Sequence, residues 1–92
     1  MLYPYITLAD ETEILHSQII DRNKQKEIEI HFERPTGTGF DTARCVLPTI
    51  TWIKREGFTH NEILFFEELI KHHAHLIYRY AEQGGIKFAQ SA

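Results

Sequence analysis

The chain of 92 residues has little cysteine, no long apolar run and no obvious targeting segment, and each shortage excludes a class of protein. Cys45 is the one cysteine, so no disulfide can form within the chain, whereas small secreted domains usually carry several. The longest apolar run extends only from Ile63 to Phe66, far short of the roughly 20 residues that a membrane-spanning helix needs. Residues 1–5 contain neither a basic segment nor an apolar one, so no signal peptide is expected. We therefore expect a cytoplasmic protein that does not contact membranes.

The chain also lacks an excess of positive charge. Ten Lys and Arg residues stand against thirteen Asp and Glu residues, which gives a formal net charge of -3 at pH 7. Proteins that bind duplex nucleic acid are usually basic, because contacts to phosphate supply most of the affinity, so this balance argues against such a function. Hydrophobic residues (42%) and charged residues (25%) occur in the proportions of a globular protein, and the length fits a single domain, residues 1–92.

Short β-prone segments separated by turn signals fill the first half of the chain. We predict strands at about residues 2–8, 12–20, 26–34 and 40–47. The third is the clearest, because Ile28, Ile30 and Phe32 alternate with polar residues, as expected of a strand with one buried and one wet face. Residues 35–39 form a turn rich in Pro and Gly, which predicts an antiparallel hairpin. Residues 49–55 are either a further strand or a short helical turn.

One long amphipathic helix is predicted over residues 59–83. Thr59 and Glu62 have the spacing of a capping box at its start, and Gly84 and Gly85 supply a left-handed stop at its end. Neither Pro nor Gly interrupts the segment, and its apolar side chains fall on one stripe. The predicted fold class is therefore α+β, with a four- or five-stranded, mostly antiparallel sheet (a meander) and the long C-terminal helix packed on one face.

The apolar arc of this helix is wider than one sheet face requires. Phe65 and Leu76 flank the central stripe, and Leu64 projects from the polar side. A helix of this length spans about 37 Å, whereas a strand of eight residues spans about 26 Å, so one end of the helix is expected to extend past the sheet. We therefore regard Leu64, Phe65 and Leu76 as candidate interface residues, with a second copy or another protein as the partner.

The histidines near the middle of the helix are the first candidates for chemistry. At about 100° per residue, His73 points into the apolar stripe while His75 lies on the far side of the helix. Glu68, His72 and His75 share one face at spacings that suit metal ligands. A solvated polar face explains the same pattern and is the interpretation that we favour, so no cofactor is expected.

Two further histidines are weak candidates for acid–base catalysis. His73 is either a functional group with a shifted pKa or a core or boundary histidine hydrogen-bonded to a strand carbonyl, and we favour the structural role. His31 alternates with Glu29 and Glu33 on the polar face of its strand, where an acid–base pair can be imagined. A charged sheet face is the interpretation of His31 that we favour, because nothing in the sequence marks a pocket there.

Trp52, Lys54 and Arg55 combine an aromatic ring with two cations, and such a set can stack on a base and hold a phosphate. Trp52 is more typical of a core or interface anchor. These three residues are nevertheless kept as candidates for a weak nucleic-acid-binding function.

No residue pattern in the chain amounts to a specific catalytic motif, which favours a function other than catalysis. The preferred hypothesis is a small protein-interaction or regulatory module that binds itself, as a homodimer, or another protein. The alternative is a small enzyme that uses histidine acid–base or metal chemistry. The second alternative is the nucleic-acid binder.

Overall fold

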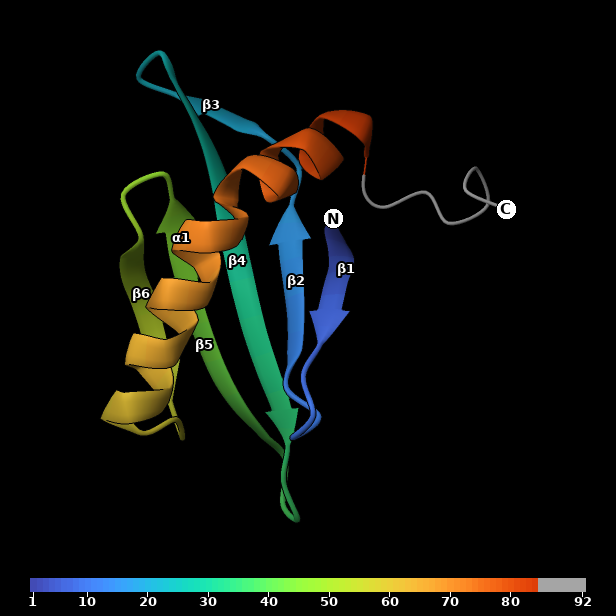
Figure 1. The fold of residues 1–92 in the computed structure, drawn as a ribbon, viewed down its shortest axis with the longest axis vertical. Coiled ribbons are helices and arrows are strands. Elements are labelled where there is room, and N and C mark those ends of the chain that lie inside the picture. Colours follow the sequence, from blue (N-terminus) through green and yellow to red (C-terminus); the bar gives the residue numbers. More distant parts are fainter. Residues whose placement is uncertain (85–92) are drawn as a thin grey trace.

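The computed structural model describes residues 1–84, which form six strands followed by one helix. The elements are β1 (Leu2–Thr7), β2 (Glu13–Ser17), β3 (Ile20–Arg22), β4 (Gln25–Pro35), β5 (Phe40–Leu47), β6 (Thr51–Glu56) and α1 (His60–Gln83). All strand pairs are antiparallel, in the order β1-β2-β4-β5-β6, and β3 also pairs with β4. The helix α1 crosses one face of the sheet (Figure 1). The predicted α+β class is confirmed, with six strands where four or five were expected.

The segment predicted as one strand over residues 12–20 is interrupted by a bulge. His16 is opposite Ile30 and Ile20 is opposite Glu27, so the three residues 17–19 face only the two residues 28–29 of β4. The Ser17 hydroxyl completes the hydrogen bonding there. Its Oγ accepts a bond from the backbone N–H of Glu29 (2.9 Å) and donates one to the carbonyl of Gln18 (2.7 Å). At the interruption, a side-chain bond thus links β2 to β4.

The turn that joins β3 to β4 is two residues long. Asn23 and Lys24 alone form it, with φ angles of 49° and 64°, and the residues on either side pair as β3 and β4. Positive φ at both central positions gives a turn whose twist matches the flanking strands.

The segment 49–55, for which a strand and a helical turn were both open, forms a strand, since Thr51–Glu56 pairs with β5 as β6.

Both outer strands of the sheet are irregular. Edge strand β1 contains Pro4, which has no N–H to donate, and its register shifts between Pro4 and Ile6. Edge strand β6 has Ile53 as an unpaired bulge residue, followed by the cations Lys54 and Arg55. Proline, bulges and exposed cations all discourage pairing with a further strand.

The helix begins and ends where its sequence signals predict. The Thr59 side chain accepts a bond from the backbone N–H of Glu62 (3.1 Å), and the Glu62 carboxylate accepts one from the N–H of Thr59 (2.9 Å). Gly84 ends the helix in the left-handed conformation, at φ 81°. Within residues 1–84, no helix combines the length and apolarity needed to cross a membrane.

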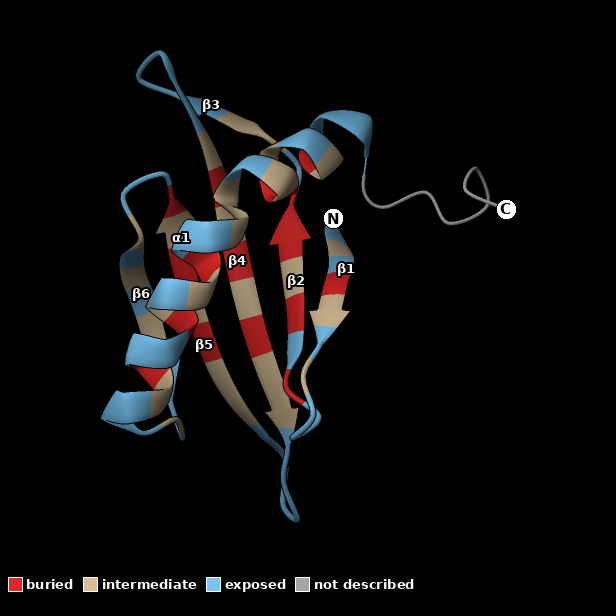
Figure 2. Ribbon diagram, in the orientation of Figure 1, coloured by how far each residue is buried: buried red, intermediate tan, exposed pale blue. Residues whose placement is uncertain are grey.

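The core lies between α1 and the inner face of the sheet, and buried positions alternate along β4 and β5 (Figure 2). Phe32 of β4 is fully buried at its centre. The Phe32 ring stacks on Phe66 of α1 at a centroid distance of 4.4 Å and also contacts the Trp52 ring at 5.5 Å. This aromatic group joins the middle and edge of the sheet to the first half of the helix.

Cys45 occupies an inner position of β5 with no exposed surface. Burial, with a further contribution from the Glu67 carboxylate, raises the pKa of the Cys45 thiol to about 12. The thiol is therefore protonated at neutral pH and unreactive. We expect a disulfide reagent such as Ellman's reagent to label the native protein only as fast as it unfolds, and the denatured protein at once. Rapid labelling of the native protein would contradict this placement.

Candidate functional site

A pocket of about 440 Å³ lies between the start of α1 and the turn that joins β1 to β2. The helix runs diagonally, so its N-terminal turns lie over β5 and β6 while its C-terminal turns reach β2 (Figure 1). The β1–β2 turn, near the lower end of the sheet and above the β4–β5 hairpin in Figure 1, stands apart from the first turns of the helix. The pocket occupies the space between them and is widely open to solvent.

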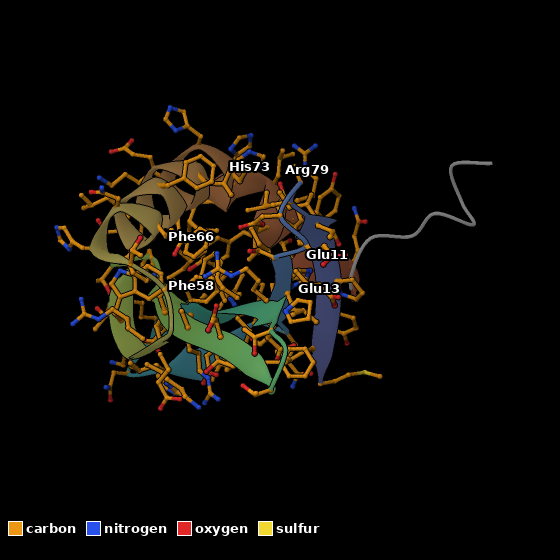
Figure 3. All side chains as sticks on the ribbon, turned by 90° about the horizontal axis from the view of Figure 1, so that it is seen from below. Glu11, Glu13, Phe58, Phe66, His73 and Arg79 are labelled. Atoms are coloured by element: carbon orange, nitrogen blue, oxygen red, sulfur yellow. The ribbon has the colours of Figure 1, made fainter. Side chains whose placement is uncertain are left out.

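Apolar side chains form most of the pocket wall. Leu8 and Ala9 contribute from the β1–β2 turn, and Phe65 and Phe66 contribute from α1. Phe66 is buried in the core, whereas Phe65 remains 54% exposed. The polar members of the lining are Asp10, Asn61 and Glu62. Seen from below, Phe58 and Phe66 lie on the helix side, and Glu11 and Glu13 lie across from them on the β1–β2 side (Figure 3).

The β1–β2 turn is held in one shape by its own hydrogen bonds. The N–H of Leu8 donates to the carbonyl of Thr12 (2.8 Å), and the N–H of Glu11 donates to the carbonyl of Leu8 (3.0 Å). The Asp10 carboxylate accepts a further bond from the N–H of Thr12 (3.0 Å). Glu11 adopts a φ of 72°, the left-handed conformation that closes the turn. This wall of the pocket is thus preformed.

Arg34, near the end of β4, connects the two walls. Its guanidinium donates five hydrogen bonds to three carboxylates, those of Asp10, Asp41 and Glu62. Asp10 belongs to the β1–β2 turn and Glu62 to the first turn of α1, so a single side chain fixes both sides of the pocket. The guanidinium also lies over the Phe58 ring, 4.7 Å from its centroid.

Two of these carboxylates have lowered pKa values. Hydrogen bonding from Arg34, followed by that from Thr59, lowers the pKa of Glu62. Hydrogen bonds from Thr12 lower the pKa of Asp10, with a smaller contribution from Arg34. Both groups are therefore charged at neutral pH, and the cluster persists into mildly acidic solution.

Gly57 makes the approach of β5 to this cluster possible. A Cβ atom at this position would lie 2.0 Å from Oδ1 of Asp41, and its φ of 90° is one that other residues rarely adopt. Asp41 is therefore free to contact Arg34 only because residue 57 has no side chain.

His73 and Tyr5 join α1 to β1 farther along the helix. The Tyr5 hydroxyl lies 2.5 Å from Nδ1 of His73, and the two rings meet edge to face. Burial raises the pKa of the Tyr5 hydroxyl, and the nearby Tyr80 raises it further. His73 thus contacts a tyrosine hydroxyl, where a strand carbonyl was one expectation. Neither Tyr5 nor His73 lines the pocket.

The remaining histidine candidates lie apart from the pocket. Nε2 of His31 is 3.2 Å from the Glu29 carboxylate on the outer face of the sheet. Nδ1 of His72 donates to the backbone carbonyl of Glu68 (2.8 Å), which is a bond within the helix. No set of three or more His, Cys, Asp or Glu residues in the described part of the chain is arranged to hold a metal ion, so Glu68, His72 and His75 are not brought together as ligands.

Trp52, Lys54 and Arg55 do not form one surface. Nε1 of Trp52 donates to the Glu67 carboxylate (2.7 Å), which holds the indole against the helix. The bulge at Ile53 places Trp52 opposite the buried Cys45, whereas Lys54 is opposite Arg44 on the outer face.

Of the interface candidates, Leu64 is 45% exposed beside Phe65, and Leu76 is half-buried.

The Arg34 cluster and the pocket were not identified from the sequence. Asp10, Arg34 and Glu62 are far apart in the chain, and each alone resembles an ordinary surface charge. His16 was also missed. It is fully buried in β2, its Nδ1 donates to the Ser17 carbonyl (2.8 Å), and its Nε2 has no hydrogen-bond partner among the described residues. The mixed pattern of residues 12–20 carried no signal for its burial.

Comparisons with models of protein families, with curated protein sequences and with solved structures found no match.

Proposed function

We propose that the protein is a small cytoplasmic protein-interaction or regulatory module that binds a bulky apolar side chain of a partner polypeptide in the pocket beside Phe65. The observation that carries the proposal is the apolar wall of this pocket, which continues onto an aromatic ring left 54% exposed. Its volume of about 440 Å³ is in the range of binding pockets. Aromatic side chains are enriched at the centres of protein interfaces.

The polar groups of the pocket favour a partner side chain over a small polar substrate. Asp10 and Glu62 are its charged members, and both carboxylates already accept hydrogen bonds from Arg34. A site that recognises a polar metabolite needs polar groups that converge on the ligand. The buried and unreactive Cys45 is consistent with the reducing environment of the cytoplasm.

A homodimer formed by pairing of sheet edges is not the form that we propose. Pro4 and the bulges in β1 and β6 discourage strand addition at both edges. Recognition through a side chain in the pocket needs no free strand edge.

Selection of peptides tests this function, because it does not require the natural partner to be known. A random peptide library displayed on phage would be selected on the wild-type protein, and the enriched peptides would then be measured against Phe65→Asp and Phe40→Asp. Phe40 is the matched control, since it is an exposed phenylalanine (65%) on the β4–β5 hairpin that does not line the pocket.

We expect the enriched peptides to share one bulky apolar residue. We expect Phe65→Asp to weaken their binding at least about tenfold and Phe40→Asp to leave it unchanged, as for the loss of a central interface residue. Both variants should retain the wild-type circular dichroism spectrum, because each ring is more than half exposed. Absence of any enriched peptide, or equal binding by Phe65→Asp, would refute the proposal.

A further inference from the structure

We infer that the polypeptide partner presents its apolar side chain between Lys or Arg residues. The inference rests on the proposed function and adds to it the chemistry of the partner. It follows from the charges that surround an otherwise apolar pocket.

The carboxylates at the pocket exceed the cations. Arg34 is shared by the carboxylates of Asp10, Asp41 and Glu62, so these four side chains carry a net charge of -2. Glu11, the next residue along the β1–β2 turn, is exposed and adds a further negative charge. Among the residues that the structure describes, no Lys or Arg lines the pocket. One guanidinium does not neutralise three carboxylates, so a cation brought there by a partner would still be attracted to the site.

Apolar and acidic groups are adjacent here in a way that suits Lys and Arg. These side chains have apolar stems and charged ends, so a stem can lie along the exposed Phe65 ring while its charge approaches Asp10, Glu11 or Glu62. The same ring can also receive a cation on its face. A partner with an apolar residue between two Lys or Arg residues would therefore place its apolar side chain against the apolar wall of the pocket and its cations near the carboxylates.

A second copy of the chain is the competing occupant. Of the large apolar residues that are exposed in the described part of the chain, Ile53 alone has a cation directly beside it in sequence, Lys54. Nζ of Lys54 already lies 3.8 Å from the Glu56 carboxylate, and Ile53 projects from the middle of an edge strand. The basic hairpin around Arg22 and Lys24 has no exposed large apolar side chain to insert. We therefore favour a different polypeptide.

Three fluorescein-labelled heptapeptides that differ only beside a central phenylalanine test the inference. Their central residues are Lys-Phe-Lys, Ser-Phe-Ser and Glu-Phe-Glu, and binding to the full chain is followed by fluorescence anisotropy at low salt. We expect the basic peptide to bind at least about tenfold more tightly than the acidic one, and this advantage to shrink as salt is added. Glu11→Gln should weaken the basic peptide about twofold, and Glu82→Gln, at the far end of α1, should have no effect.

The outcomes separate the inference from the proposed function. Equal affinity for all three peptides, lost in Phe65→Asp, would overturn the charge inference and leave the proposed function intact. No binding of any peptide would overturn both. Sedimentation that shows self-association, abolished by Ile53→Asp and by Phe65→Asp alike, would identify a second copy as the occupant and overturn the inference of a separate partner.

Discussion

Substitution Phe32→Ala is expected to lower the free energy of unfolding by about 3–5 kcal/mol, the range for removing a buried aromatic ring. The Phe32 side chain is fully buried and contacts two other rings, Phe66 at 4.4 Å and Trp52 at 5.5 Å between centroids. Loss of the ring would leave a cavity where the helix meets the sheet. Equilibrium unfolding in urea, followed by Trp52 fluorescence, measures the effect.

Two further variants make this result interpretable. Phe32→Leu keeps most of the volume and should cost less than Phe32→Ala, which provides a measurable value if the alanine variant does not fold. Phe40→Ala removes the same kind of ring from an exposed position (65%) and should change stability by no more than about 0.5 kcal/mol. Similar losses for Phe32→Ala and Phe40→Ala would contradict the packing described for Phe32.

Substitution Arg34→Met is expected to lower the free energy of unfolding by about 2–3 kcal/mol at neutral pH. The variant keeps the apolar stem but leaves the carboxylates of Asp10, Asp41 and Glu62 facing one another without a cation. Removing one partner of a fully buried ion pair costs about 3–5 kcal/mol, and the Arg34 side chain is 21% exposed, so a somewhat smaller loss is expected. Arg22→Met is the matched control, because Arg22 is half exposed and its ion pairs are worth little.

The difference between Arg34→Met and the wild type should also depend on pH. In the folded wild type the pKa values of Glu62 and Asp10 lie below their ordinary values of 4.5 and 3.8, so their stabilisation is present above those ordinary values and is lost as pH falls through the folded pKa. Without Arg34, protonation relieves repulsion among the carboxylates. The difference in stability should therefore be largest near neutral pH and shrink below about pH 4. A difference independent of pH would show that Arg34 acts through packing alone.

Features set by neighbouring residues could be predicted from the sequence. The helix start depends on Thr59 and Glu62, which are three residues apart, and its end depends on Gly84, so both limits were predicted correctly. Strand β4 was predicted from its alternation of apolar and polar residues, which burial of one sheet face imposes directly. Helical geometry placed Phe65 beside the apolar stripe, and the structure leaves this residue 54% exposed, while its role at an interface stays a prediction.

Features set by distant residues could not be predicted in this way. At the break between β2 and β3, the N–H of Glu29 in β4 donates to the Ser17 hydroxyl, and the two residues are 12 apart in the chain. The partner of His73 is Tyr5, which is 68 residues away in the chain. Arg34 links the β1–β2 turn to the helix start, which lie on the two sides of the pocket, and that arrangement arises only once the sheet has formed.

The most direct test of the pocket as the binding site is an NMR titration of the ¹⁵N-labelled protein with the Lys-Phe-Lys peptide. The largest amide shifts are expected at residues that line the pocket on both sides, namely Leu8, Ala9, Asp10, Asn61 and Phe65. The amide signals of residues whose side chains lie on the outer face of the sheet, such as His31 and Arg44, should not shift. Shifts centred on the outer face or on β6, with the pocket unaffected, would contradict the account.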